Sequence, residues 1–277
     1  MSKQQTEKEF LKAYNPNKYE RPSVTADILV FTTIKDELYL LMIQRKSHPY
    51  KDCWAIPGGF VSMDETAKEA AIRELYEETS VKDVCLEQLY TFSKVDRDPR
   101  MRVISIAYIV MVPFEKLQFK SGDDAKNARL FLVKAQANNE FELVLKKKDR
   151  INAKCTTDFQ KELDEKEEDF VLREKDLAFD HYEIIKMAIK RMRGKIKYSN
   201  IAFSFLNDLD DFTLTELRYI YDAINSQKAD IGNFRRFIKR EYEQKGFIVQ
   251  NNSKRIERGR PATTYNWARE RSLIFDE

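Results

Sequence analysis

The stretch from Gly58 to Val81 constrains the fold more than any other part of the sequence. It begins with two adjacent glycines, which allow the backbone to come close to a ligand, and continues as a run of good helix formers. Because helix positions four apart share a face, Glu74 and Glu78 stack one above the other, with Glu77 beside them. The stretch therefore predicts a loop and about four turns of helix with three carboxylates along one edge.

Three neighbouring carboxylates repel one another unless a cation neutralises them, and clustered carboxylate oxygens suit Mg2+ or Mn2+. Arg73 can hydrogen-bond a neighbouring carboxylate and hold its orientation. The opposite face offers small side chains that can pack closely against a sheet: Ala67, Ala70, Ala71 and Leu75. The alternative is a solvated, glutamate-rich amphipathic helix without a metal ion.

The spacing of this stretch, G-x5-E-x7-R-E-L-x-E-E-x-S-V, resembles the signature box of the Nudix hydrolases. These enzymes cleave nucleoside diphosphates linked to another moiety. The fixed positions of the box are occupied here by Glu65, Arg73, Glu74, Glu77 and Glu78. The resemblance implies a metal-dependent pyrophosphohydrolase in which Glu74 or Glu77 activates water and Arg73 belongs to the catalytic set.

The same resemblance implies a site for Mg2+ (or Mn2+) formed by Glu74, Glu77, Glu78 and the carbonyl oxygen of Gly59. Ser80 departs from the family, which has glycine just after the helix, where a left-handed residue commonly ends it. The substitution affects the end of the turn and leaves every carboxylate of the box in place.

β-branched and aromatic residues mark strands on both sides of this helix. The predicted strands cover residues 24–32, 37–44, 84–92, 103–112, 128–133, 141–145 and 170–172. A polar arm, residues 1–23, precedes them, and a charged excursion, residues 146–169, separates the last two. Asp123 or Asp124 could supply a further carboxylate, but turn formation explains both equally well.

The charged loop 94–102 is the best candidate for substrate recognition. Arg97, Arg100 and Arg102 would lie beside the metal and phosphate site, and Arg45 belongs to the same predicted set. Guanidinium groups contact phosphates or ribose through several donors. A charged hairpin tip without a ligand is the alternative. The Arg-Asp-Pro-Arg run and the following strand resemble the branch of the Nudix family that handles ADP-ribose and its regulator relatives.

Length and charge divide the chain into two parts. Its 277 residues suffice for about two domains. From residue 184 onward the chain has 19 Lys and Arg against 12 Asp and Glu, whereas residues 1–183 have 30 against 34. Such asymmetry favours contact of the basic part with nucleic acid, with a solvated surface as the alternative.

Other classes of protein are disfavoured by what the sequence lacks. The three cysteines form no C-x-x-C pair, so neither a disulfide framework nor a zinc site is indicated. The N-terminal residues are polar, and the longest apolar run, residues 104–114, is too short to span a bilayer. We therefore expect a cytoplasmic protein without a membrane role.

The basic part has the pattern of two short helices and a hairpin. A helix from His181 to about residue 195 leads into it, and His181 could cap or pack this helix or reach the nucleotide pocket. Thr213 and Glu216 have the spacing of a capping box, which opens a helix that runs to about residue 225. A second helix is expected from about residue 231 to 243, followed by strands 247–250 and 263–267 around a basic tip.

Helix, turn, helix and hairpin resemble a winged helix-turn-helix, in which Asn and Arg read bases and a wing lies over phosphates. The alternative is a small basic domain that binds only protein. The predicted DNA-binding side chains are Asn233, Arg235, Arg236, Lys239, Arg240, Arg258 and Arg260.

The combination of both parts resembles the Nudix-related, NrtR-like transcriptional regulators. The expected fold class is α+β: a Nudix α/β/α sandwich with a mixed sheet, residues 1–180, followed by a linker helix and winged helix domain, residues 181–277. The resemblance implies a homodimer that binds double-stranded operator DNA and senses ADP-ribose or a related sugar compound.

Two functions follow, and they are compatible. The first is a DNA-binding regulator whose Nudix domain binds, and also hydrolyses, an ADP-ribose-type diphosphate. The second is a pyrophosphatase whose C-terminal domain serves assembly only.

Overall fold

The computed structural model describes residues 6–82, 84, 86–117, 125–136, 140–146, 169–257 and 260–268. Several positions singled out above lie outside these residues. They are Asp123, Asp124, Arg258 and all but the two ends of the charged excursion.

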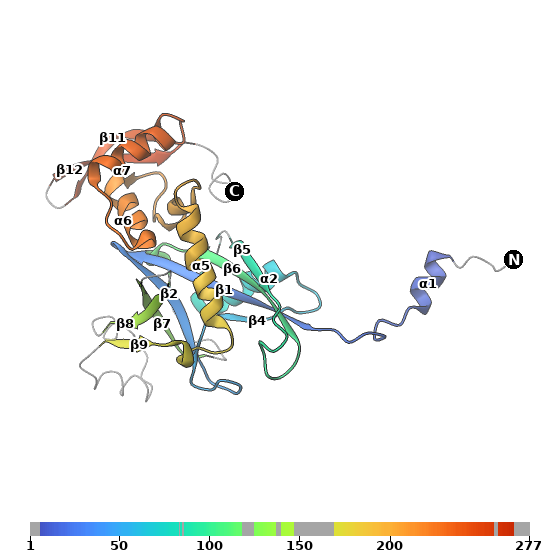
Figure 1. Cartoon of the computed structure of the whole chain (residues 1–277). Coiled ribbons are helices and arrows are strands. Elements are labelled where there is room, and N and C mark those ends of the chain that lie inside the picture. The colour runs from blue at the N-terminus through green and yellow to red at the C-terminus, as the bar shows by residue number, and fades with distance from the viewer. Residues whose placement is uncertain are drawn as a thin grey trace.

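A mixed sheet forms the centre of the N-terminal part (Figure 1). Its main path runs in the order β5-β6-β1-β2-β7-β8-β9, with β3 paired to β2 and β4 paired to β1. Strands β1 and β6 are parallel, and the other pairs are antiparallel. The strands are β1 Ser23–Ile34, β2 Glu37–Arg45, β3 Trp54–Ala55, β4 Gly58–Phe60, β5 Leu86–Phe92, β6 Val103–Met111, β7 Ala125–Ala135, β8 Phe141–Leu145 and β9 Phe170–Leu172.

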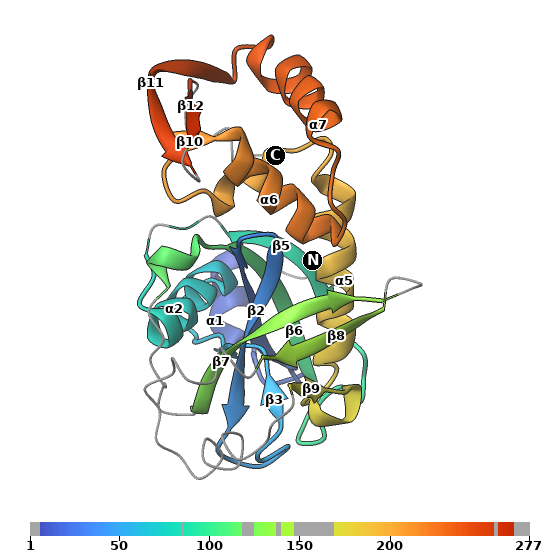
Figure 2. The same cartoon turned by 90° about the vertical axis from the view of Figure 1, so that its left-hand side faces the viewer.

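Two helices cover opposite faces of this sheet, α2 (Ala67–Thr79) and α5 (His181–Lys195), as Figure 2 shows. The alternation of side chains along β1 explains the two layers. Ile28 and Val30 belong to the cluster that contains the buried side chains of α2, whereas Leu29 and Phe31 belong to the cluster that contains those of α5. The predicted α/β/α sandwich with a mixed sheet is confirmed.

The predicted strands are present, with ends that differ by a few residues. The two short strands β3 and β4 were not predicted, because two or three residues carry no periodicity. The N-terminal arm contains one helix, α1 (Glu7–Ala13), none of whose residues is buried, and Figure 1 shows it away from the sheet.

The C-terminal part is a winged helix. Its helices α6 (Leu214–Asn225) and α7 (Ile231–Ile238) precede the hairpin of β11 (Ile248–Glu257) and β12 (Arg260–Trp267). The capping box of Thr213 and Glu216 is present at the start of α6. Strand β10 (Phe212–Thr213) pairs with β12. Two short helical turns lie in this part, η4 Ile201–Phe205 and η5 Lys239–Glu243, and two lie in the N-terminal part, η1 Phe114–Lys116 and η3 Glu174–Asp176.

Two expectations for this part differ from the structure. Helix α7 ends at Ile238 and continues as a π-helical turn, because the backbone hydrogen bond from Gln244 reaches back five residues to Lys239. The strands of the wing extend through much of the predicted tip, since Lys254 pairs with Thr263 and Arg255 with Ala262.

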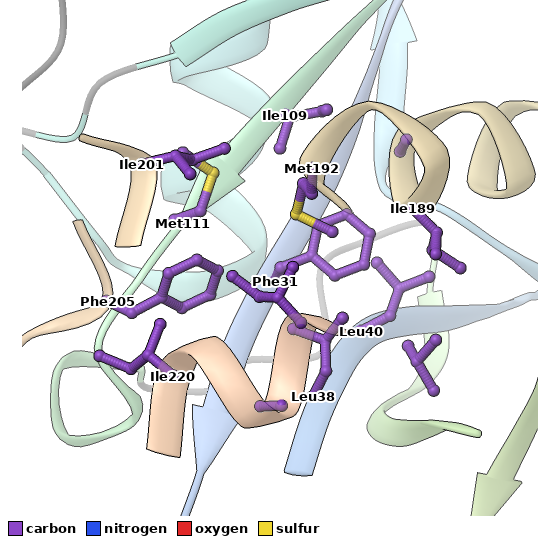
Figure 3. Packing of buried hydrophobic residues seen from close by; sticks show 14 of the residues in the cluster. Phe31, Leu38, Leu40, Ile109, Met111, Ile189, Met192, Ile201, Phe205 and Ile220 are labelled. Carbon is purple, nitrogen blue, oxygen red and sulfur yellow. The ribbon is translucent and has the colours of Figure 1, made fainter. Parts of the chain in front are cut away.

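One hydrophobic core runs through both parts of the chain. Figure 3 shows Ile201, Phe205 and Ile220 of the winged helix part beside Phe31 and Leu38 of the sheet. Helix α5 contributes Ile189 and Met192 to the same cluster. It thus packs as a layer of the sandwich and also adjoins the winged helix, although it was predicted as a linker helix. The boundary at residues 180 and 181 stays a prediction.

Candidate effector and active site

A cavity of about 740 Å3 opens between the box helix, the sheet and the start of α5. It gathers residues that are far apart in the chain. Among its lining residues are Asp27, Arg45, Gly58, Gly59, Phe60, Arg73, Glu74, Glu77, Glu78, Arg97, Asp98, Arg100, Phe179 and His181. The cavity therefore unites the box with three of the four predicted substrate-binding arginines.

Helix α2 presents the box carboxylates at different depths. Thr66 and Glu69 form a capping box that fixes its first turn, and Ala70, Ala71 and Leu75 are buried against the sheet. The side chain of Glu74 is 15% exposed and that of Glu77 is 52% exposed, while Glu78 is buried. One face of the helix packs while the neighbouring face offers oxygen ligands at the cavity.

Arg73 braces the loop before α2. Its Nη2 and Nε donate to the two carboxylate oxygens of Glu65 at 2.8 and 3.2 Å, and its Nη1 donates to Glu74 Oε1 at 2.7 Å. Nη2 also donates to the carbonyl oxygen of Phe60 at 3.3 Å. The Arg73 hydrogen bonds hold the pKa of Glu65 at about 2. These contacts orient the site, and Arg73 acts as a positioning residue.

The two glycines before this loop are required by close approach. A Cβ at Gly59 would collide with the carboxylate of Glu74, and a Cβ at Gly58 would lie 2.5 Å from the carbonyl oxygen of Ala26. Only glycine lets the Gly59 backbone reach the box carboxylates.

Ser80 ends α2 in the left-handed conformation, with φ of 56°. Its N–H donates to the carbonyl oxygen of Tyr76 at 2.8 Å. The helix therefore ends as glycine would end it, and the box carboxylates keep their places.

The donors at this site fit a hard divalent cation, because carboxylate oxygens and a backbone carbonyl are the ligands that Mg2+ and Mn2+ accept. Burial raises the pKa of Glu74, and the hydrogen bond and charge of Arg73 oppose the shift. Among the described residues no three His, Cys, Asp or Glu side chains already converge into a cage.

Arg97, from the loop 94–102, is buried in an internal ion network. Its Nη2 lies 2.7 Å from Asp180 Oδ1 and 3.4 Å from Asp27 Oδ2, and its Nε donates to Asp180 Oδ2 at 3.0 Å. Ser105 donates a hydrogen bond to Asp27, whose pKa burial raises. Arg97 thereby shapes the wall of the cavity and ties it to α5.

Arg100 and Arg45 lie on the aromatic side of the cavity. The guanidinium of Arg100 lies 5.5 Å from the ring centre of Phe60 and 5.9 Å from that of Phe179. Arg45 approaches the Phe179 ring at 5.0 Å. Arg102 does not line the cavity, and its guanidinium donates instead to the carbonyl oxygens of Ser93 and Lys94, where it stabilises the loop.

His181 lines the cavity as the first residue of α5. Its Nδ1 accepts a hydrogen bond from the backbone N–H of Ile56 at 3.1 Å, and burial lowers its pKa to about 3. The imidazole is therefore neutral, with its proton on Nε2. His181 joins β3 to α5 and contributes to the cavity wall at the same time.

A second concave surface, of about 1130 Å3, lies between α6, α7 and the wing. Arg235, Lys239 and Arg260 line it, together with Arg218 and Gln250. Of the other predicted DNA-binding side chains, Asn233, Arg236 and Arg240 lie outside this groove. Arg236 donates a hydrogen bond to Asn233, and Arg240 pairs with Glu241.

Sequence reasoning did not single out Asp27, Phe60, Phe179 or Asp180, which all contribute to the cavity or its wall. One signal was present for Asp27, an acidic residue inside an otherwise apolar strand pattern. The other three carry no spacing signal, because loops and strand ends bring them to the cavity.

Comparison with known proteins gives one family match in each part of the chain. Residues 21–154 match the family model of the NUDIX domain, and residues 202–267 match that of the NrtR DNA-binding winged helix domain. The ADPR responsive transcriptional repressor NtrR of Acinetobacter baylyi is 28% identical over 265 residues, which are 95% of this chain and 89% of that protein.

A further relative matches the Nudix part of the chain, and a solved structure matches most of its length. An ADP-ribose pyrophosphatase of Methanocaldococcus jannaschii is 42% identical over 130 residues, 47% of this chain and 72% of that protein. The crystal structure of Shewanella oneidensis NrtR complexed with a 27mer DNA superposes with a TM-score of 0.63 at 26% identity, covering 88% of this chain and 93% of that one.

Proposed function

Because the chain belongs to the Nudix family and carries an NrtR winged helix domain after its Nudix domain, we propose that it is an ADP-ribose-responsive transcriptional regulator. One observation carries the proposal: a cavity with acidic and guanidinium groups adjoins the same helix, α5, that packs against a basic winged helix. The similarity to an ADPR responsive repressor over 95% of the chain supports it. Such a regulator works in the cytoplasm, where it meets DNA.

We propose that the protein binds DNA as a homodimer that occupies two half-sites. The DNA would lie across the concave surface of each winged helix. Arg235, Lys239 and Arg260 line this surface and supply positive charge for phosphates or bases. Asn233, Arg236 and Arg240 occupy another face of α7 or its continuation and would contact the edges of the site. Arg258 belongs to the same predicted set but lies outside the described residues.

Hydrolysis of the effector is a second proposed activity, supported by Glu74, Glu77 and Glu78 of the box, which all line the cavity. A divalent cation held by Glu74, Glu77, Glu78 and the Gly59 carbonyl would offset diphosphate charge and lower the pKa of a water molecule. The exposed carboxylate of Glu77 could accept a proton from the attacking water molecule, while Arg73 holds the carboxylate of Glu74 in place. Arg100 and Arg45 are placed to contact the diphosphate or ribose.

An effector can change DNA affinity only through different affinities for two arrangements of the protein. Helix α5 is the physical connection between the two sites. At its start Asp180 and His181 contact the cavity wall, and near its end Arg193 donates to Ile224 and Ser226 at the C-terminus of α6, both at 3.0 Å. A small shift of α5 on ligand binding would therefore move α6.

The test combines a hydrolysis assay of ADP-ribose with Mg2+ and a titration of operator DNA with and without ADP-ribose. The proposal predicts DNA binding that ADP-ribose changes. Removing one phosphate contact, as in Arg235→Ala or Arg260→Ala, should reduce the salt dependence of DNA affinity by about one unit of slope, whereas Lys116→Ala on the Nudix domain should not. Turnover without DNA binding would leave a pyrophosphatase whose winged helix serves assembly.

A further inference from the structure

A buried carboxylate holds the turn between the two helices of the winged helix part. Asp222 of α6 is 2% exposed. Its Oδ1 accepts a hydrogen bond from the backbone N–H of Ala229 at 2.7 Å, and its Oδ2 accepts one from Arg218 Nη1 at 2.6 Å. The next residue, Asp230, caps α7 by accepting from the N–H of Asn233 at 2.8 Å. The turn therefore determines the direction in which α7 leaves α6.

Helix α5 contacts this turn at one place. Arg193, near the end of α5, donates to the carbonyl oxygen of Ile224 and to Ser226 Oγ, both at 3.0 Å. Ser226 ends α6 in the left-handed conformation, with φ of 52°. A second contact, farther along the turn, would fix the orientation of the turn as well as its position.

The tip of the hairpin formed by β1 and β2 makes such a second contact. Asp36 lies between the two strands, and its Oδ2 is 3.2 Å from Nζ of Lys228. Lys228 directly precedes Ala229, the residue whose N–H is bound at the turn. The hydrogen bond from Lys228 holds the pKa of the Asp36 carboxyl below its usual range, and the charges of Lys228 and Arg218 act in the same direction. The Asp36 carboxylate is thus stabilised by two cations of the winged helix part.

The other end of the same hairpin lines the cavity of the Nudix part. Thr25 and Asp27 of β1 are among the lining residues, as are Ile43 and Arg45 of β2. Between the two ends, Leu38 packs in the core that the sheet shares with α6 (Figure 3). Close-packed interiors transmit small displacements because they contain little empty space. A displacement of β1 or β2 at the cavity would therefore be carried to the hairpin tip.

We propose that Asp36 is a positioning residue for DNA recognition, because it holds the turn before α7 through Lys228. The hairpin of β1 and β2 then forms a second connection between the effector cavity and the DNA groove. Since α5 contacts the turn at Ser226 and the hairpin contacts it at Lys228, a ligand that moves one element relative to the other would rotate α7. The inference rests on the proposed function, because it concerns how the effector changes DNA binding.

The test uses the full-length protein and a DNA duplex selected from random sequences for its affinity to the unsubstituted protein. The response is the factor by which ADP-ribose changes the affinity for this duplex. The Lys228 side chain is 80% exposed, and exposed ion pairs contribute little, so Asp36→Ala should reduce the response by about 3-fold. ADP-ribose affinity without DNA should stay within about 2-fold, because Asp36 is not among the residues that line the cavity.

Glu37→Gln is the matched control. It removes the same charge from the same hairpin, but Glu37 pairs with Lys146 of the Nudix part instead of with the winged helix. Its response should equal that of the unsubstituted protein.

An exchange of charges tests the contact itself. Lys228→Asp alone places two carboxylates opposite each other and should reduce the response at least as much as Asp36→Ala. Asp36→Lys combined with Lys228→Asp re-forms the pair with its signs exchanged, so the double variant should respond more strongly than Lys228→Asp alone. A direct contact of Lys228 with DNA would contribute to the affinities with and without ADP-ribose and would largely cancel from the response.

An unchanged response in Asp36→Ala would overturn the inference and leave the proposed function intact, with α5 as the connection. A loss in Glu37→Gln as large as that in Asp36→Ala would assign the effect to the charge of the hairpin and would also overturn the inference. If the unsubstituted protein bound no DNA, or bound it equally with and without ADP-ribose, the proposed function and the inference would fail together.

Discussion

Asp180 Oδ1 lies 2.7 Å from Arg97 Nη2, and this contact joins the cavity wall to the residue that precedes α5. The two residues are 83 positions apart in the chain. Both side chains are largely buried, so the pair is shielded from solvent and its geometry is well determined. The pair therefore connects the cavity wall to the start of the helix that reaches the winged helix.

Asp180→Asn should weaken the communication between effector and DNA. The amide cannot keep the charge-assisted contacts with Arg97, so the start of α5 is held less firmly. We expect the factor by which ADP-ribose changes DNA affinity to become about 5-fold smaller. DNA affinity without effector should stay within about 2-fold of the original value.

The control for this variant is Glu183→Gln, an exposed acidic residue in the first turn of the same helix. Its DNA response should match that of the unsubstituted protein. If ADP-ribose changed the DNA affinity of Asp180→Asn as much as that of the unsubstituted protein, the ion pair would not be what connects the cavity to the DNA site.

Gly59→Ala should slow hydrolysis of ADP-ribose by about 100-fold while leaving the fold intact. The new Cβ would displace the carboxylate of Glu74, and a displacement of a catalytic group by about 1 Å can cost on the order of 100-fold in rate. Gly194→Ala is the matched control, because a Cβ there meets nothing within 4 Å. Retained turnover in Gly59→Ala would show that Glu74 does not need its present position.

Ser80→Gly should raise the free energy of unfolding by about 1 kcal/mol. The left-handed conformation costs serine more than glycine, and the buried Ser80 Oγ has no hydrogen-bond partner within the described part of the chain. Urea denaturation measures the change. Ser226 is also left-handed at the end of α6, but its hydroxyl accepts from Arg193 at 3.0 Å, so Ser226→Gly should give a smaller gain or a loss.

Stability should fall in mild acid because of His181. Its pKa is about 3 in the folded state against 6.5 for an unperturbed histidine, so below pH 6.5 the unfolded chain binds the proton first. As the pH falls from 6.5 to 3, this one group lowers the free energy of unfolding by about 1.4 kcal/mol per pH unit. The loss ends only below the folded pKa.

Between pH 7 and 5 the free energy of unfolding of His181→Gln, measured by urea denaturation, should fall by about 2 kcal/mol less than that of the unsubstituted protein. His48→Gln, which changes the other, exposed histidine, is the control and should keep most of the acid-dependent loss. An acid-dependent loss that is the same in both variants would contradict a neutral, buried His181.

The elements that sequence reasoning predicted best are those whose signals are local. The helix of the Nudix box and the capping box at the start of α6 follow from residues within four positions of one another. The pairing of Arg97 with Asp180, the placement of Phe179 and the internal role of Arg102 depend on contacts between distant segments. No pattern along the chain distinguishes an arginine that lines a cavity from one that stabilises its own loop.

The groove residues of the winged helix illustrate the same limit. Asn233, Arg235, Arg236, Lys239 and Arg240 all read as polar positions of one helix, and only the packing of Phe234 and Ile238 determines which of them face the wing. The transition to a π-helical turn after Ile238 changes the angular spacing of later residues, which a uniform helical period does not anticipate.

The continuous core has a consequence for how such chains diversify. Ile220 and Phe205 of the winged helix part meet Phe31 and Leu38 of the sheet, so a winged helix exchanged with that of a distant relative would bring mismatched side chains to this contact. Recombination at this point would be selected against, and substitutions on the two sides would be expected to occur in compensating pairs. The shared contact therefore restricts which winged helix domains can pack against this sheet.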